Sequence, residues 1–403
     1  MLATGLVFLL WVLSQSADRA QVPPPITPET AAARTPHTRD QYVGVDACRP
    51  CHAAIVQSFV KSGHWLSSRA ATAESVTASI PPGGETIATS NPELHYRVEA
   101  RPEGIFQVAV IGPPENPRLR TQRIDLVIGS GQRGQTFLWW RGDELLQLPL
   151  SYWNELKAWG NSPGYSDRVA DFTKPVIPRC LDCHATFAEA SGAASNRFNK
   201  ASVLLGITCE KCHGPAGDHV AARRSNRTAF APPGHDVVNP TRLERDRRVD
   251  LCASCHGGQI LGPPFSFVPG DPVKRAAVLP RRTGRSDVPT GSPVNLGIDS
   301  HGQQATSLMN SRCFQASSMT CATCHSPHAA PRDASTTSSD RCLTCHTVEA
   351  CGRFATDGRT IAGRCVGCHM PVQPSRLILS GNAGRTAQAQ LRSHLIGIYP
   401  DAR

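Results

Sequence analysis

The chain is short of aromatic residues, of lysine and of long apolar runs. Aromatic residues make up 6% and hydrophobic residues 40% of its 403 positions, whereas glycine and proline number 33 each. This composition predicts a chain that is poor in an apolar core of its own. The apolar run at 1–13 is shorter than the about 20 residues that a membrane-spanning helix needs. We therefore expect no transmembrane anchor in this first segment.

Cysteine, by contrast, is abundant and regularly arranged. Fourteen of the 16 cysteines fall in seven Cys-x-x-Cys-His pentapeptides. Chance would supply on the order of 0.02 such pentapeptides at the frequencies of this chain. They are motif 1 (Cys48, Cys51, His52), motif 2 (Cys180, Cys183, His184), motif 3 (Cys209, Cys212, His213), motif 4 (Cys252, Cys255, His256), motif 5 (Cys321, Cys324, His325), motif 6 (Cys342, Cys345, His346) and motif 7 (Cys365, Cys368, His369).

The spacing within each motif is that of covalent haem attachment. Two thiols three positions apart can add to the two vinyl groups of one porphyrin, and the adjacent imidazole then binds the iron as its proximal ligand. A structural zinc site would combine two half-sites into four ligands, but the number of motifs is odd and each carries its own histidine. A disulfide scaffold would explain the cysteines but not the histidines. We therefore expect seven covalently bound haem c groups, each with its iron.

Arginine carries most of the positive charge. The formal net charge is +10, and only six of the 42 basic residues are lysine. Each haem brings two propionates, so the excess arginine is expected to act as countercharge within the holoprotein. The planar guanidinium suits that role because it binds a carboxylate bidentately and stays protonated. No basic helix or aromatic-basic module accompanies the charge, which argues against nucleic-acid binding.

The N-terminal residues predict export. Residues 1–16 are typical of a signal peptide, with an apolar segment followed by small residues, and residues 17–40 resemble a linker rich in Pro, Thr and Ala. The first cysteine is Cys48, so no cysteine lies where a lipid would be attached after cleavage. Haem c is attached outside the cytoplasm, and the motifs therefore agree with a periplasmic or extracellular location.

The rest of the chain divides by motif density. Residues 41–75 carry motif 1, residues 76–176 alternate with the period of β-strands, residues 177–375 carry the other six motifs, and residues 376–403 form a tail. The six-motif region offers too little chain to bury a separate core around each motif. We expect a mainly α or irregular fold with little regular structure, a core organised by the cofactors and a small antiparallel β insert.

Two features of the insert invite a functional interpretation. Gly129–Gly134 has the spacing of a dinucleotide-binding turn, but such a turn must open a helix. Since Thr136–Trp140 is β-branched and aromatic, a glycine hairpin is favoured. Four tryptophans in this region predict a packed aromatic core or, alternatively, a wall against the porphyrins or a docking face. They are Trp139, Trp140, Trp153 and Trp159.

The second axial ligand of each iron separates carriers from enzymes, because an open position lets a small molecule bind. Eight histidines lie outside the motifs. His64, His219 and His328 are the strongest candidates, since the first follows the helix that bears motif 1 and the others closely follow proximal histidines. His235 and His301 are further candidates for metal ligation.

Three other histidines are weaker candidates. His95 lies in the β insert, and His37 and His394 lie in the linker and the tail, where solvent exposure is expected. If His37 and His394 are not ligands, one iron uses Met309, Met370 or no protein ligand.

Several runs of residues resemble exported multihaem cytochromes c. They are Cys209–His219, Met319–His328 and Cys365–Pro371, together with Ser62–His64 and the insert from Ile128 to Tyr165. These cytochromes form a family related to the tetrahaem cytochrome of ammonia oxidisers and to hydroxylamine oxidoreductase.

The resemblance covers about residues 41–375 and implies that His64, His219 and His328 are distal haem ligands. The chain lacks the Cys-x-x-Cys-Lys variant that marks the catalytic haem of pentahaem nitrite reductases. No crosslinking tyrosine of the hydroxylamine oxidoreductase type can be assigned. Both departures favour a carrier over an enzyme.

The sequence thus predicts a heptahaem c-type cytochrome that transfers electrons through closely spaced haems outside the cytoplasm. One alternative is an oxidoreductase that acts on a small nitrogen or sulfur compound at one open haem. Another is a haem-bearing subunit of a membrane redox complex. Enzymatic activity is left open, with no catalytic residue assigned. The expected partners are redox proteins or a membrane redox complex, and peripheral membrane association is compatible with either.

Two cysteines, Cys313 and Cys351, belong to no motif and flank motifs 5 and 6. In an oxidising compartment a disulfide between them is expected, and it would close a loop that carries two haems. A thiolate ligand to a haem iron is the alternative role.

Overall fold

The computed structural model describes residues 37–225, 237–258, 260–273, 302–329, 339–383 and 385–399. All seven motifs lie in these ranges, whereas the predicted signal peptide and nearly all of the predicted linker lie outside them. The strands are β1 (Ser68–Ala70), β2 (Glu85–Ala88), β3 (Leu94–Arg101), β4 (Gly104–Ile111), β5 (Arg118–Arg123), β6 (Leu126–Ile128), β7 (Gly134–Arg141), β8 (Glu144–Trp153), β9 (Ala158–Asn161), β10 (Ala185–Ala190), β11 (Phe198–Leu205), β12 (Val372–Asn382) and β13 (Arg385–Arg392).

The helical segments hold most of the motif residues. The α-helices include α1 (Val45–Phe59), α2 (Pro178–Asp182), α3 (Cys209–His213), α4 (Gly217–Arg224), α5 (Arg245–His256), α6 (Gln304–Met309), α7 (Arg312–Gln315), α9 (Phe354–Asp357) and α10 (Cys365–His369). The 3₁₀ turns include η2 (Arg39–Gln41), η3 (Trp65–Ser67), η4 (Pro240–Arg242), η5 (Cys321–Thr323), η6 (Val348–Ala350) and η7 (Gly358–Arg364).

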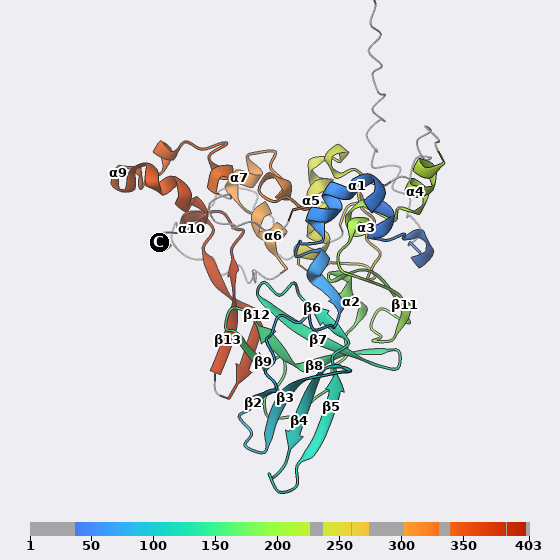
Figure 1. The fold of residues 1–403 in the computed structure, drawn as a ribbon. Helices are drawn as coiled ribbons and strands as arrows, with labels where there is room; N and C mark the ends of the chain where they lie inside the picture. The colour runs from blue at the N-terminus through green and yellow to red at the C-terminus, as the bar shows by residue number, and fades with distance from the viewer. Residues whose placement is uncertain are drawn as a thin grey trace, which may run out of the picture. The chain divides into compact units, whose positions relative to one another are not determined.

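The prediction of a mainly helical and irregular fold with a small β insert is wrong. The described residues contain four antiparallel sheets, two of them large and two of them hairpins (Figure 1). The β10–β11 hairpin lies between motifs 2 and 3, and the β12–β13 hairpin follows motif 7. The second hairpin contains Pro374, and β13 is rich in Ala, Gln and Arg, which favour helices. Tertiary contacts therefore override the local propensity in these segments.

The two large sheets share one apolar core. The five-stranded sheet has the order β1-β6-β7-β8-β9 and the four-stranded sheet the order β2-β3-β4-β5 (Figure 1). Tyr96 of β3, Phe137 of β7 and Leu148 of β8 belong to the same buried cluster. The side chain of Gln107 on β4 joins the sheets by donating to Leu150 O at 2.9 Å and accepting from Leu150 N at 3.0 Å. These strands thus form a self-packed body that needs no cofactor for its core.

The aromatic and glycine features of this body are structural. Trp139, Trp153 and Trp159 are buried, as the aromatic-core interpretation predicts. Gly129–Gly134 connects β6 to β7 in an antiparallel hairpin, so the prediction of a hairpin instead of a dinucleotide-binding turn is confirmed. Gly129 has φ +101°, and a Cβ there would lie 2.7 Å from Gly134 O. Glycine is therefore required by the turn and not by a bound phosphate.

The β12–β13 hairpin packs against the five-stranded sheet. Trp153 at the end of β8 forms a buried cluster with Ala389 and Leu391 of β13. A Cβ at Gly160 in β9 would lie 2.8 Å from the Ser380 hydroxyl, so that glycine permits a close approach of β12. The hairpin connects the chain after motif 7 to the β-rich body and fixes where the following tail begins.

Candidate functional site

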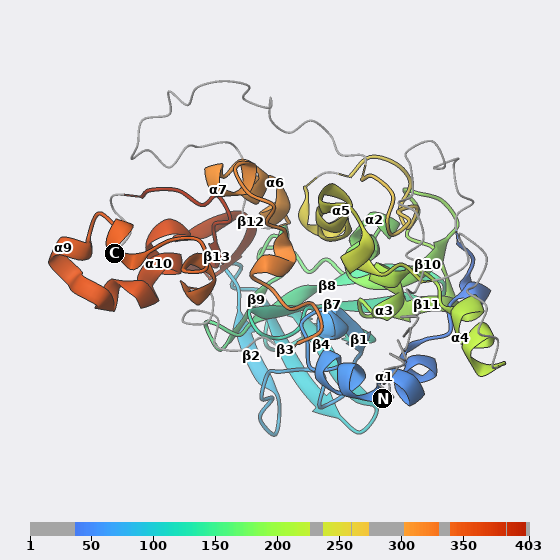
Figure 2. The ribbon, with the colours of Figure 1, turned by 90° about the horizontal axis from the view of Figure 1, so that it is seen from above.

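Short helical turns carry the motif residues. Motif 1 lies in α1, motif 3 is α3, motif 4 ends α5 and motif 7 is α10, while motifs 2 and 5 begin in α2 and η5. Motif 4 lies on a helix that is in contact with α6, which in turn contacts α7 (Figure 2). In an α-helical turn, positions i and i+3 share one face, so two cysteines at this spacing present their sulfurs to one side. Attachment of both to one porphyrin requires this arrangement.

A buried carboxylate joins motif 3 to the start of the helix that bears motif 1. Glu210, which lies between the two cysteines of motif 3, is only 3% exposed. Its Oε1 accepts from Val43 N at 3.0 Å and from Ala216 N at 2.9 Å, and its Oε2 accepts from Gly44 N at 2.9 Å. Three backbone amides from two separate segments are thus satisfied by one side chain, which holds motifs 1 and 3 together.

A second carboxylate joins motifs 2, 3 and 4. Asp182, within motif 2, accepts from Arg179 at 2.7 Å and from Lys211 of motif 3 at 3.1 Å. The Asp182 carbonyl oxygen lies 3.9 Å from the Cys255 thiol of motif 4. Because Asp182 is itself buried, these partners compensate its desolvation. Motifs far apart in sequence therefore meet at this residue.

Thiols of different motifs also approach each other. The Cys183 thiol is hydrogen-bonded to Cys255, which raises the pKa of Cys183 and lowers the pKa of Cys255. Three more hydrogen-bonded pairs join motif 1 to motif 3, motif 4 to motif 5, and motif 6 to motif 7. They are Cys48 with Cys209, Cys252 with Cys321, and Cys342 with Cys365. The attachment sites are thus neighbours in space.

Three motif histidines face a histidine from elsewhere in the chain. The ring of His213 in motif 3 is nearly parallel to that of His328, with ring centroids 6.0 Å apart and an interplanar angle of 10°. The ring of His325 in motif 5 lies 6.2 Å from that of His394, with 27° between the ring planes. His256 of motif 4 lies 6.2 Å from His64 at an angle of 62°.

This separation fits one metal ion between two imidazoles. A histidine nitrogen binds a metal at about 2 Å and its ring centre lies about 1 Å farther back, so two rings on opposite sides of one metal have centres about 6 Å apart. The three measured separations of 6.0, 6.2 and 6.2 Å match that spacing. Two rings in van der Waals stacking would be closer. The pairs therefore fit a haem iron with two axial histidines.

Hydrogen bonds at the other ring nitrogen orient several of these imidazoles. The Nδ1 atoms of His213 and His369 lie 2.7 Å from Val238 O and 2.8 Å from Gly397 O. The Nδ1 of His256 lies 3.2 Å from Gln304 Oε1. An Nδ1–H that donates to an oxygen leaves Nε2 as the free base that can bind a metal, and it increases the basicity of that nitrogen.

The surroundings favour the neutral imidazole, which is the form that binds iron. Burial lowers the pKa of His394 to about 4, although the hydrogen bond to Arg392 O acts in the opposite direction. The pKa of His328 is lowered mainly by burial and also by the nearby His213. Loss of solvation lowers the pKa of His64, and His256 and His325 lower it further. Because His325 also acts on His64, the pairs of motifs 4 and 5 lie near each other.

The structure brings together some of the predicted ligands and leaves others apart. His64 and His328 each lie against a motif histidine, while His219 lies on α4 just after motif 3. His235 and His301 lie outside the described residues.

The structure also shows where two of the weaker candidates, His95 and His394, lie. His95 lies on β3, opposite Val110 in the four-stranded sheet. His394, expected in solvent, instead lies in a half-buried segment beside His325. The alternation of polar and apolar residues in Thr386–Leu391 was the one signal that this tail folds back on the protein.

The predicted disulfide is absent, since Cys313 and Cys351 are both free thiols. Within the ranges that the structure describes, no three His, Cys, Asp or Glu side chains converge as a self-contained metal site. No helix among the described residues is long and apolar enough to cross a membrane.

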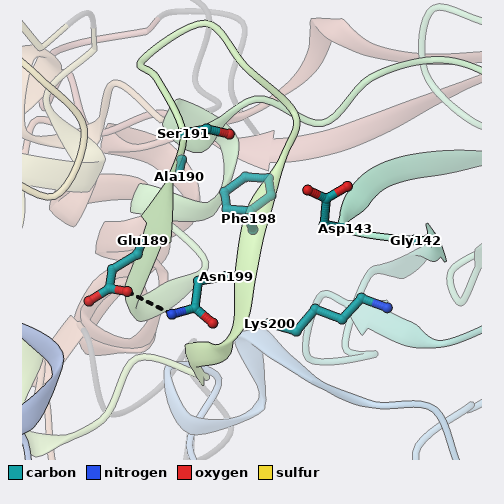
Figure 3. A pocket seen from close by; sticks show the side chains of 8 residues that line it. All are labelled: Gly142, Asp143, Glu189, Ala190, Ser191, Phe198, Asn199 and Lys200. Atoms are coloured by element: carbon teal, nitrogen blue, oxygen red, sulfur yellow. Dashed lines mark hydrogen bonds between the residues drawn. The ribbon is translucent and has the colours of Figure 1, made fainter.

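A surface pocket lies at the turn end of the β10–β11 hairpin. Figure 3 shows Asn199 Nδ2 donating to Glu189 Oε2, a bond of 2.9 Å, on one side of the pocket. Lys200 lies over the ring of Trp140 at 4.9 Å, and Asp143 pairs with Arg197 at 2.9 Å. None of the lining residues belongs to a motif, so this pocket is no part of the haem site.

Comparisons with known proteins point to cytochromes. Residues 157–214, which contain motifs 2 and 3, match the family model of cytochrome c554 and c-prime. The fold is similar to that of Outer Cell Wall Cytochrome OcwA, with a TM-score of 0.50 and 15% identity over 89% of this chain and 80% of that chain. An undecaheme cytochrome from the S-layer of Carboxydothermus ferrireducens aligns at 17% identity over 84% of this chain and 52% of that chain, with a TM-score of 0.36. No curated protein matches. The family-model match supports the cytochrome c554 side of the resemblance, and no comparison gives a link to hydroxylamine oxidoreductase.

Proposed function

We propose that this protein is a multihaem c-type cytochrome that carries electrons outside the cytoplasm, with one covalent haem at each of its seven motifs. The observation that carries the proposal is the set of three histidine pairs with ring centroids 6.0 to 6.2 Å apart. Each bound haem would supply a one-electron Fe(III)/Fe(II) couple. The chain's own residues set the position, ligation and surroundings of each couple.

The contacts between motifs support a connected path for electrons. Thiol pairs and buried carboxylates link motif 1 to motif 3, motif 2 to motifs 3 and 4, and motif 4 to motif 5. Motifs 6 and 7 are linked by Cys342 and Cys365. The haems would therefore be neighbours in an extended series instead of isolated centres.

Closed coordination favours a carrier over an enzyme. An iron with two protein ligands has no position for a small substrate and exchanges electrons without binding one. The histidine pairs at motifs 3, 4 and 5 have separations that fit this arrangement. The proposed partners are accordingly redox proteins or a membrane redox complex.

The proposed location is outside the cytoplasm. Covalent haem attachment takes place there, and the similar fold of OcwA belongs to a protein described as an outer cell wall cytochrome. The N-terminal segment with the composition of a signal peptide lies outside the described residues. Its cleavage belongs to the proposal as well.

The haem count is the direct test. Intact-mass analysis of the protein matured with a haem-attachment system is expected to exceed the polypeptide mass by seven haems of about 0.6 kDa each. Cys183→Ser removes one thioether bond at motif 2 and should lower the occupancy of that site alone. Cys313→Ser is the matched control, because Cys313 belongs to no motif, and it should retain seven haems. A count of six or fewer in the parent protein, or zinc in place of iron by elemental analysis, would contradict the proposal.

A further inference from the structure

The chain that follows β13 runs back over the motif region and is held there on both sides. Ser393 N donates to Pro371 O at 2.9 Å, and Gly397 N donates to His369 O at 3.1 Å. On the other side, Ile396 N donates to the hydroxyl of Ser311 at 2.8 Å. Ser311 is buried at the start of α7 and also contacts His394 O at 3.3 Å. The segment 393–399, which we name the C-terminal strap, is therefore fixed in place.

The C-terminal strap contacts the histidines of two different motifs. The Gly397 carbonyl oxygen lies 2.8 Å from Nδ1 of His369 in motif 7. Three residues earlier, the ring of His394 lies 6.2 Å from the ring of His325 in motif 5, with 27° between the ring planes. His394 Nδ1 lies 3.2 Å from Arg392 O, and this bond leaves Nε2 as the free nitrogen of the ring.

We propose that His394 is the sixth ligand of the iron at motif 5 and that the C-terminal strap thereby closes this haem to small molecules. The inference rests on the proposed function, because it requires a haem at Cys321 and Cys324. His394 is not among the ligands that the resemblance to known cytochromes implies, and its place in the tail does not predict this role. The Gly397 contact makes the same strap a positioning element for the proximal histidine of motif 7.

The test is the spin state of the ferric holoprotein carrying His394→Ala. Electron paramagnetic resonance is expected to show one haem per molecule converted from low spin to high spin, because the iron at motif 5 loses its second nitrogen ligand. Added imidazole should restore the low-spin signal by occupying the vacated position, and cyanide should bind to the variant but not to this haem in the parent. His95→Ala is the control, since His95 lies on β3 and faces no motif histidine in the described contacts; its spectrum should equal that of the parent.

Unchanged low-spin spectra in His394→Ala with the full haem count would overturn the inference. If the alanine variant does not accumulate, His394→Met serves instead, since a thioether ligand changes the charge-transfer absorption of one ferric haem. A methionine variant with the parent spectrum would equally refute the proposal. Failure of the proposed function gives a different result, because the parent protein itself would then contain too few haems by mass.

Discussion

Glu210→Ala is expected to lower the free energy of unfolding by about 3 to 5 kcal/mol, because it leaves buried donors without their charged acceptor. The carboxylate accepts from Val43, Gly44 and Ala216 amides at 2.9 to 3.0 Å, and none of these bonds can be replaced by the alanine methyl group. Since the contacts join the start of α1 to α3, the loss should separate motif 1 from motif 3. Denaturant titration of the holoprotein, followed by haem absorbance, measures the effect.

A matched control for this change is Glu189→Ala. Glu189 is an exposed residue of β10 whose carboxylate accepts one bond, from Asn199 at 2.9 Å. Removal of such a surface group is expected to change the stability by less than about 0.5 kcal/mol. Glu210→Gln should fall between the two, because the amide keeps an acceptor oxygen but loses the charge. Equal stabilities of the Glu210→Ala and Glu189→Ala variants would show that the buried carboxylate does not join the motifs.

His64→Met is expected to raise the midpoint potential of one haem by an amount on the order of 100 mV. The thioether donates less electron density than imidazole, and it therefore stabilises Fe(II) relative to Fe(III). The affected haem should be the one at motif 4, since His64 lies 6.2 Å from His256. Spectroelectrochemical titration of the holoprotein should show one component displaced and the others nearly unchanged.

We expect the potential of only one haem to change, because the proximal histidine of motif 4 is held by a contact that does not involve His64. His256 keeps its contact with Gln304 Oε1 at 3.2 Å whichever residue occupies position 64. His95→Met introduces the same thioether into β3 and should leave every potential in place. A set of potentials in His64→Met that superimposes on the parent set would remove His64 from the ligands.

The sequence predicts the attachment sites from local residues alone, because each site is defined by a run of five positions. The spacing of two cysteines and a histidine is sufficient for the chemistry of one porphyrin, and no distant residue has to be known. Local patterns also predict the hairpin at Gly129–Gly134, where turn residues and β-branched neighbours agree. Features determined by neighbouring residues can thus be predicted from the chain alone.

Local patterns do not predict which histidine faces each proximal histidine, because this pairing depends on contacts between distant segments. Nothing near His64 indicates that it faces motif 4 instead of motif 1, which it follows in sequence. The expectation of solvent exposure for His394 rests only on its place in the tail, and the β12–β13 hairpin that positions it depends on contacts with the distant five-stranded sheet. The helix-favouring residues of β13 concealed that strand.

On the proposed function, the order of the paired histidines along the chain would also determine when each iron is protected during biogenesis. His64 precedes motif 4, so the iron there can find its second ligand as soon as its haem is attached. His328 and His394 follow motifs 3 and 5, and a chain that emerges from its N-terminus presents them later. Until then the newly attached haems at motifs 3 and 5 would be exposed to cyanide, carbon monoxide or peroxide. Closure at motif 5 would therefore report that export has passed residue 394, and shorter chains would be chemically distinguishable by an iron that still binds such molecules.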